Sequence, residues 1–482
     1  MNFSNANVPK EVRSPAQTEH HKSIVLFAMC IAVFIAQLDI SVVTLALKQI
    51  GAGLDAGVSA LQWVIDAYNL FYACFLLTAG ILGDRFGRRA MFNAGIILFA
   101  VGSLICGFSP NAALLIVGRA VTGLGAAFVI PTSLAILSSA YLDHAERAHA
   151  IGIWASCNAL AQLFGLTAGG FAVDYLGWRW IFLLVVPACV LGCFLALRFV
   201  TESYGGKERG LDIPGQILAV LALGGFAFGF IEAPLIGWLS WAVLFSLLIA
   251  AAATIIFARV EVNTKDALVP GFLFRRTRFP AALLIAIAMT FGMYATTFLT
   301  PLYLQNVLHD SAVVAGIEML PMSVSFLIVG RASGKLAIRF GPRAVMAGGT
   351  AAMGAGLLIL SAVSLDWSLA ANVALVESGV LIAGVGLGLN AGPVVSAAVS
   401  AAPESYAGVA SGIVNTARIV GATLGVAVLG AVYASKAGQT AADAAGIVEG
   451  FRLAMWGAAA SELVGTVVAL LFIRSDALRR EG

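Results

Sequence analysis

Charged side chains are scarce in this chain of 482 residues. Asp, Glu, Lys and Arg together make up 11% of it, whereas an average soluble domain carries ~25%. Hydrophobic residues make up 60%, and the few charges are gathered into short islands between long apolar runs. This shortage of charge excludes a soluble enzyme, a nucleic-acid-binding protein and a disordered chain.

Cysteine is also rare, and motifs of catalysis are missing. All six cysteines lie inside apolar runs, where free Cys packs as a small hydrophobe. The sequence contains no ATP-binding loop, no metal-ligand cluster and no hydrolytic triad. We therefore expect no enzymatic activity, no bound metal and no cofactor. The polar stretch 1–22 lacks a cleavable-signal pattern, so the first apolar run is expected to act as an uncleaved signal anchor.

Long apolar runs occupy most of the sequence instead. A spanning helix needs about 20 mostly apolar residues, and because the runs are continuous rather than alternating, they exclude a membrane β-barrel. The expected fold is an all-α integral membrane protein with fourteen transmembrane helices. The predicted spans are Ser23–Leu47, Ala60–Leu82, Ala90–Phe108, Ala112–Leu137, Ala148–Val173, Arg179–Phe199, Ile213–Ile231, Trp238–Ala258, Phe279–Leu302, Val313–Ala337, Ala344–Leu365, Ala371–Ala398, Gly408–Ala434 and Phe451–Ile473.

The positions of Lys and Arg predict the orientation. With the N-terminus in the cytoplasm, 21 of the 28 Lys and Arg residues fall on the cytoplasmic side, as the positive-inside rule requires. Four fall outside, at Lys48, Arg179, Lys436 and Arg452. The remaining three lie within spans, at Arg119, Arg331 and Arg418. We expect a multi-pass protein of the plasma (inner) membrane with both termini cytoplasmic.

Two loops far apart in the chain share a motif. The loop Gly80–Arg89 reads Gly-Ile-Leu-Gly-Asp-Arg-Phe-Gly-Arg-Arg, and the loop Gly334–Arg343 reads Gly-Lys-Leu-Ala-Ile-Arg-Phe-Gly-Pro-Arg. Six positions agree at a constant offset of 254 residues. The match predicts two homologous six-helix halves related by a pseudo-two-fold axis, with a two-helix insert, a plan typical of secondary transporters. The expected parts are a cytoplasmic tail 1–22, a first bundle 23–200, an insert 201–271, a second bundle 272–475 and a cytoplasmic tail 476–482.

Several segments together resemble a known family. The loop Gly80–Arg89 is similar to the signature loop of the major facilitator superfamily. The segment Leu38–Leu47 resembles the first-helix motif of its fourteen-spanner drug:proton antiporters, the multidrug, quaternary-ammonium and methyl viologen resistance type. Trp63–Leu70 and Gly177–Phe182 resemble further stretches of that family. The resemblance covers the whole chain and implies an antiporter that exchanges drugs for protons.

Three motifs depart from the family pattern. The fourth-helix motif Arg-x-x-Gln-Gly appears as Arg119-Ala-Val-Thr-Gly, and the fifth-helix motif Gly-Pro-x-x-Gly-Gly appears as Gly165–Gly170 with Leu166 in place of the proline. The proline that commonly ends the first-helix motif is Lys48 here. Because the fifth-helix motif is associated with antiporters, Leu166 weakens the assignment of export, although it does not affect the fold.

Two charged residues inside the spans are the candidates for proton coupling. A charge at the membrane centre costs at least ~2.5–3.5 kcal/mol, so each one that is retained is a functional candidate. Asp39 lies in the first span, where removal from water favours its protonated form, as a proton carrier requires. Arg119, in the fourth span, stays charged, and the resemblance implies that it takes part in coupling. The alternatives are a structural carboxyl at Asp39 and a static salt bridge at Arg119.

Other intramembrane residues are candidates for substrate binding. Glu232 ends the seventh span and either contacts substrate or lies in the outer headgroup region. Glu318, in the outer part of the tenth span, either attracts a cationic substrate or is partly solvated. Weaker acidic candidates are Asp66, Glu377 and Glu462. Arg418 is expected to lock helices together. Aromatic residues that could stack on a flat drug, although most such residues simply pack, are Trp63, Tyr68, Phe71, Tyr294, Phe298 and Tyr303.

The loop Gly80–Arg89 is the expected gating element. Its glycines allow tight turning, Asp84 can accept from a helix N-terminus, and Arg88 and Arg89 can meet lipid phosphates or an acidic partner in the other half. Such contacts would hold the cytoplasmic side shut and release it on proton movement. The same charges also serve as a topology signal. The expected gating residues are Gly80, Asp84, Arg85, Gly87, Arg88 and Arg89.

These features predict proton-coupled efflux by alternating access. An ion gradient must supply the energy, and the intramembrane acids outnumber the arginines, which favours hydrophobic, cationic drugs. The expected partners are protons, membrane lipid and a small amphipathic substrate, with no nucleic acid, and the expected state is a monomer. The alternatives left open are an exporter of one natural product or metabolite of its own cell, a nutrient:proton symporter and a non-transporting receptor.

Overall fold

The computed structural model describes residues 15–205, 210–263, 269–275, 277–403, 406–438 and 443–473. These ranges contain fourteen helical spans that are long and apolar enough to cross a membrane, so the predicted fold class is confirmed. The helical form follows from the solvent, because a lipid-facing backbone must satisfy its hydrogen bonds within the segment. The predicted tail 476–482, much of the tail 1–22, and the loop cations Lys207 and Arg209 lie outside the described residues.

The first six spans are built from nine helical elements, two of the spans being interrupted. The fifth span consists of α5, the π-helical turn η1 and α6, and the sixth consists of α7 and α8. The elements are α1 (Pro15–Leu54), α2 (Val58–Phe86), α3 (Arg88–Gly107), α4 (Ala112–Ala140), α5 (His144–Phe164), η1 (Gly165–Gly169), α6 (Gly170–Tyr175), α7 (Trp178–Leu183) and α8 (Val185–Phe199).

The remaining eight spans comprise the inserted pair and the second half. The insert is α9 (Ile213–Ile236) and α10 (Trp241–Asn263), followed by the short 3-10 turn η2 (Gly271–Arg275). The second half contains α11 (Arg278–Asn306), α12 (Ala312–Glu318), α13 (Leu320–Phe340), α14 (Pro342–Leu360), α15 (Leu369–Ala401), α16 (Ala407–Ala437) and α17 (Ala444–Phe472). Its tenth span is divided into α12 and α13 near Pro321.

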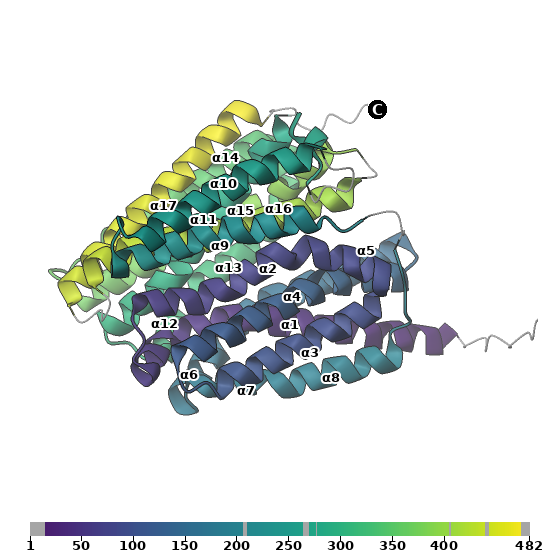
Figure 1. The fold of residues 1–482 in the computed structure, drawn as a ribbon, viewed down its shortest axis with the longest axis horizontal. Coiled ribbons are helices and arrows are strands. Elements are labelled where there is room, and N and C mark those ends of the chain that lie inside the picture. Colours follow the sequence, from purple (N-terminus) through teal and green to yellow (C-terminus); the bar gives the residue numbers. More distant parts are fainter. Residues whose placement is uncertain are drawn as a thin grey trace, which may run out of the picture.

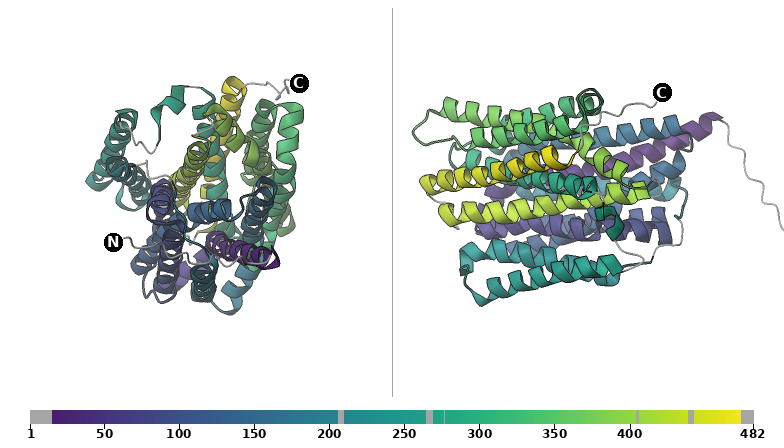
Figure 2. Two further views of the ribbon diagram at one scale, coloured as in Figure 1. Left: turned by 90° about the vertical axis from the view of Figure 1, so that its right-hand side faces the viewer. Right: turned by 90° about the horizontal axis from the view of Figure 1, so that it is seen from above.

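The two halves lie side by side as two layers of helices (Figure 1). The purple and blue helices α1–α8 form one layer and the green and yellow helices α11–α17 form the other. The insert α9–α10, drawn in teal, lies at the margin of the molecule when it is viewed from the end (Figure 2). Helix α9 packs on α10 and also contacts α2 of the first half and α16 of the second. The insert therefore touches both halves.

The repeated loops have the same backbone geometry. Gly87 and Gly341 adopt positive φ angles of 108° and 84°, a conformation that glycine adopts without steric cost, and each one links two consecutive spans. Arg85 stands over the ring of Phe86 at 5.5 Å, as Arg339 stands over Phe340 at 5.2 Å. The sequence repeat is thus also a structural repeat.

Some helices end at other residues than the sequence predicts, because the end of an apolar run and the end of the backbone hydrogen-bond pattern do not coincide. Helix α9 continues through Pro234 to Ile236, so Glu232 lies within the helix and does not end it. Conversely, α14 ends at Leu360 rather than Leu365. An apolar run measures how well a segment tolerates lipid, whereas a helix ends where its last carbonyls find other partners.

Candidate functional site

Asp39 and Arg119 form a buried ion pair between α1 and α4. Arg119 Nη1 lies 2.5 Å from Asp39 Oδ2, and the two side chains are 1% and 2% exposed. Arg119 Nε donates to the backbone oxygen of Val64 at 2.9 Å, and its guanidinium stands 4.6 Å from the ring centre of Tyr68. Such a pair needs further hydrogen bonds to offset its desolvation. The two predicted coupling residues are therefore in contact, while their role in coupling stays a prediction.

Close packing of α2 on α4 holds Arg119 in place. Gly123, one turn after Arg119, faces the backbone of Tyr68, and a Cβ at Gly123 would overlap the Tyr68 carbonyl oxygen. The Tyr68 hydroxyl in turn donates to the backbone oxygen of Ala36 at 3.3 Å. Tyr68, a predicted substrate contact, is buried in this conformation and belongs to the surroundings of the ion pair.

A cavity of about 580 Å³ lies between the two halves. Residues of α2, α4 and α5 line one side and residues of α16 line the other. Its wall is largely apolar with a few polar groups, the composition typical of small-molecule sites. The apolar lining includes Leu76, Leu77, Ile130, Leu134 and Trp154, and the polar lining includes Tyr72, Thr132, Ser411 and Asn415. Of the predicted gating residues, Gly80, Asp84, Arg85 and Arg88 line this cavity.

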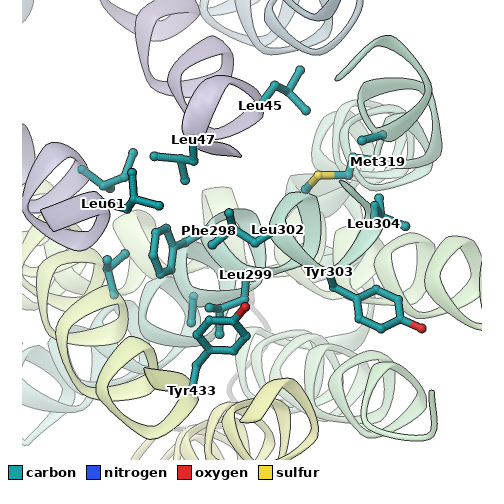
Figure 3. Close-up of a cluster of buried hydrophobic side chains, with 14 of the residues drawn as sticks. Leu45, Leu47, Leu61, Phe298, Leu299, Leu302, Tyr303, Leu304, Met319 and Tyr433 are labelled. Carbon is teal, nitrogen blue, oxygen red and sulfur yellow. The ribbon is translucent and has the colours of Figure 1, made fainter. Parts of the chain in front are cut away.

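A hydrophobic cluster closes the space between the halves at the opposite end (Figure 3). Leu45 and Leu47 of α1 belong to this cluster with Phe298 and Leu302 of α11. Phe298, a predicted substrate contact, is fully buried in it. The chain is therefore closed at one end and has its cavity at the end that carries the loop Gly80–Arg89.

Hydrogen bonds between the halves reinforce the closed end. Asp174 of α6 accepts from the first two backbone N–H groups of α12, at 3.0 and 2.9 Å, where an anion is favoured by the helix dipole. Lys48 Nζ donates to the backbone oxygen of Gln305 at 2.5 Å, and Gln305 Nε2 donates to that of Leu45 at 3.0 Å. In the same region burial raises the pKa of Asp310, against the opposing effect of His309.

The glycines of the fifth span allow this closure. A Cβ at Gly170 would lie 2.7 Å from the backbone oxygen of Ala312 in the other half. From the facing side, a Cβ at Gly316 would overlap the backbone oxygen of Leu166. The segment Gly165–Gly170 therefore permits backbone-to-backbone approach between the halves, and it does so with Leu166 where the family pattern has proline.

We expect Asp174→Asn to loosen the closed end. The amide offers one oxygen instead of two, so one backbone N–H of α12 loses its acceptor, at a cost of ~0.5–1.5 kcal/mol. A single cysteine at Leu45, which is fully buried in the closed state, should then react with a water-soluble maleimide roughly two- to tenfold faster. Asp55→Asn removes an exposed charge near the end of α1 and is the control. Equal labelling rates in all three proteins would contradict the role of Asp174.

The contacts of the gating loop differ from the prediction. Arg88 donates to Asp84 at 2.8–2.9 Å on the same loop, and Arg89 donates to the backbone oxygen of Val200 at 3.2 Å. Among the described residues, neither arginine has an acidic partner in the other half, as the sequence had suggested. In the part of the chain that the structure describes, the Asp84 carboxylate accepts from Arg88 and not from a helix N-terminus.

Glu202 performs the capping role that was predicted for Asp84. Its carboxylate accepts from the backbone N–H groups of Arg89 and Ala90, at 2.8 and 3.1 Å, in the first turn of α3. It also lies 3.8 Å from Arg89 Nε. Glu202 follows the sixth span in a polar stretch without any motif, so the sequence contains no signal that connects it to the loop.

The remaining predicted substrate residues lie away from the cavity lining. Trp63 Nε1 donates to Glu232 Oε1 at 2.8 Å and so ties α2 to the insert. Glu318 on α12 is 7% exposed, and its Oε2 has no hydrogen-bond partner among the described residues. Tyr294 of α11 is partly buried and packs against the hydrophobic cluster of the closed end. Substrate contact by these residues stays a prediction.

Comparisons with known proteins agree with this architecture. Residues 29–426 match the family model described as Major Facilitator Superfamily. The chain belongs to that superfamily. It is 36% identical over 412 residues to "Multidrug resistance protein Stp" of Mycobacterium tuberculosis (strain CDC 1551 / Oshkosh), covering 86% of this chain and 76% of the relative. It is 31% identical over 425 residues to "Methylenomycin A resistance protein" of Streptomyces coelicolor, covering 88% of each.

A solved structure supports the same fold. The chain matches a bacterial homolog of the human lysosomal transporter Spinster, crystallised in an inward-facing and unoccupied conformation. The TM-score is 0.66 at 17% identity, over 94% of this chain and 96% of that one. The chain is thus a multi-pass membrane protein with a transporter fold.

Proposed function

We propose that this chain is a proton-coupled exporter of small amphipathic molecules, working by alternating access rather than as an enzyme. The observation that carries the proposal is the combination of a buried Asp39–Arg119 pair with a cavity closed at one end. The relatives named for drug and antibiotic resistance support the export direction. Both halves and the cavity belong to one chain, so a monomer can complete the cycle.

The Asp39–Arg119 pair can couple proton movement to transport. In the described conformation Arg119 holds Asp39 in a buried ion pair. When the halves move and Asp39 is protonated, its charge is neutralised and the attraction to Arg119 is lost. Tyr68 connects the pair to the cavity, because its ring lies 6.0 Å from that of Tyr72, which lines the cavity. A change in the ion pair can thus alter the wall of the cavity in which the substrate binds.

We place the open end of the cavity in the cytoplasm of a cell with the chain in its plasma membrane. The Lys and Arg bias puts the loop Gly80–Arg89 and both termini on the cytoplasmic side. The described conformation would then be inward-facing, with Asp174 and the hydrophobic cluster closing the outer end. The fifth span makes its glycine contacts with Leu166 in place of the proline of the family motif. The missing proline, which was the reason to consider uptake, is therefore no argument against export.

The export direction can be tested in everted membrane vesicles. Acidifying the vesicle interior should drive a substrate dye inward, because the cytoplasmic face points outward. We expect accumulation several times above that of vesicles without the protein, and its loss when a protonophore is added. A drug-susceptibility panel on a deletion strain supplies the compounds to use. An importer would give no such loading, and accumulation that survives the protonophore would contradict proton coupling.

The orientation has its own test. A cysteine at His309, in the loop between α11 and α12, should react with an impermeant maleimide added outside intact cells. A cysteine at Leu142, which is 85% exposed in the loop between α4 and α5, should react only after the cells are opened. The reverse pattern would overturn the assignment of sides.

A further inference from the structure

Arg418 carries a positive charge with no acidic partner among the described residues. It lies in α16, and its one hydrogen bond among the described residues runs from Nη2 to the backbone oxygen of Ala391, at 2.7 Å. Its Nε is buried and has no partner in that part of the chain. As predicted, Arg418 does link two helices, but a neutral carbonyl leaves the charge uncompensated.

The other cations of the described spans are in different situations. Arg119 is neutralised by Asp39. Arg331 of α13 is exposed, whereas Arg418 of α16 is half-buried. An ionised group inside a membrane protein is retained at a substantial energetic cost, and it usually pairs with another group or marks a substrate path. Arg418 is thus a half-buried cation for which no ion pair is seen among the described residues.

Arg418 is not itself a lining residue of the cavity, but it lies on α16 next to residues that are. Ser411, Gly412 and Asn415 line the cavity from this helix, and Arg418 follows Asn415 by three residues on the same helical face, about 4.5 Å further along the axis. Arg418 thus lies about one helical turn beyond the polar lining.

The charges around the cavity have a net positive sign. Asp84 and Arg88 neutralise each other, and Arg85 is a further cation at the mouth. The acids that suggested a cationic substrate do not supply a compensating charge, because Asp39 is bound to Arg119, Glu232 accepts from Trp63, and Glu318 lies on α12 at the closed end.

We infer that Arg418 binds an anionic group of the substrate. The preferred substrate is then an amphipathic organic acid, with its carboxylate at the guanidinium and Asn415, and its apolar body against Leu76, Leu77 and Trp154. A guanidinium is suited to a carboxylate because it offers paired donors in a planar fork. This inference rests on the proposed function and specifies its substrate class.

The test compares three probes that share one fluorophore and differ in charge. They are N-dansylglycine, which carries a carboxylate, its neutral primary amide, and the cationic N-dansylethylenediamine. Binding to the purified full-length protein in lipid nanodiscs is measured by fluorescence anisotropy at neutral pH. We expect the carboxylate to bind roughly tenfold or more tightly than the amide, the range for a hydrogen bond to a charged group. The cationic probe should bind most weakly.

Three variants assign the preference to Arg418. R418Q should bring the carboxylate to within about twofold of the amide while the amide affinity stays unchanged, and R418K should keep part of the preference. R331Q removes an intramembrane arginine away from the cavity and should behave as wild type. Loss of amide and carboxylate binding by the same factor in R418Q would show a structural role and overturn the inference.

The comparison of the three probes on the wild-type protein tests the anionic preference even if R418Q does not fold. If the carboxylate binds no more tightly than the amide, or if the cationic probe binds best, the inference is wrong. Failure of proton-driven export in vesicles is a separate result, because the binding assay involves neither a gradient nor a direction.

Discussion

Asp39→Asn should abolish proton-driven export. The amide keeps the size of the side chain and an oxygen that can accept from Arg119, but it cannot bind or release a proton. In proteoliposomes with an imposed pH gradient, accumulation of substrate should fall to that of protein-free vesicles. Exchange of labelled for unlabelled substrate, which needs no net proton movement, should persist. The result would separate coupling from binding.

Two further variants make this outcome specific. Asp39→Glu keeps a titratable carboxyl and should retain part of the gradient-driven transport, whereas Asp55→Asn removes an exposed charge and should leave transport intact. Breaking a buried pair costs ~3–5 kcal/mol when one charge is left uncompensated, so thermal unfolding of Asp39→Asn must be measured in parallel. Full gradient-driven export by a folded Asp39→Asn protein would place the coupling carboxyl elsewhere.

Gly316→Ala should stop transport by preventing closure of the outer end. A methyl group at this position would overlap the backbone oxygen of Leu166 in the other half, and backbone atoms cannot move aside as a flexible side chain can. Because the clash lies between the halves, each half can still fold by itself. We expect transport to fall by at least tenfold, together with faster labelling of a cysteine at Leu45, as the outward-open state becomes the favoured one.

Gly330→Ala is the matched control for this substitution. Gly330 lies in the same span, in α13, and nothing lies within 4 Å of a Cβ built there. Both changes raise helix propensity by about the same amount, so any difference between them comes from the contact. Normal transport by Gly316→Ala would mean that the backbones of α12 and the fifth span separate at little cost.

The sequence predicts the spans well because lipid imposes a simple rule. Each helix must be apolar over the membrane thickness, so all fourteen runs could be recognised, and the repeated loops indicated the two halves. The rule does not determine where a helix ends. This is why α9 passes Pro234 and why α14 is shorter than its apolar run.

The site could be predicted only in part. Asp39 and Arg119 were identifiable because single charges in apolar runs are costly, yet only the fold brings residues 80 positions apart to 2.5 Å. Glu202 could not be identified, since its role depends on where the loop after α8 returns. The charge preference was predicted from a count of acids, whereas the structure shows that charges must be assigned to partners first. Arg418 could therefore be proposed as a binding residue only once its lack of an acidic partner among the described residues was known.

We propose that substrate and proton cross the membrane in opposite directions through one chain, with Asp39 carrying the proton. Proteoliposomes that contain a pH-sensitive dye test it most directly, when an outward substrate gradient is imposed without any pH gradient. We expect wild-type vesicles to acidify inside as the substrate leaves, and Asp39→Asn vesicles not to acidify. Substrate efflux without acidification in the wild type, or equal acidification in Asp39→Asn, would contradict it.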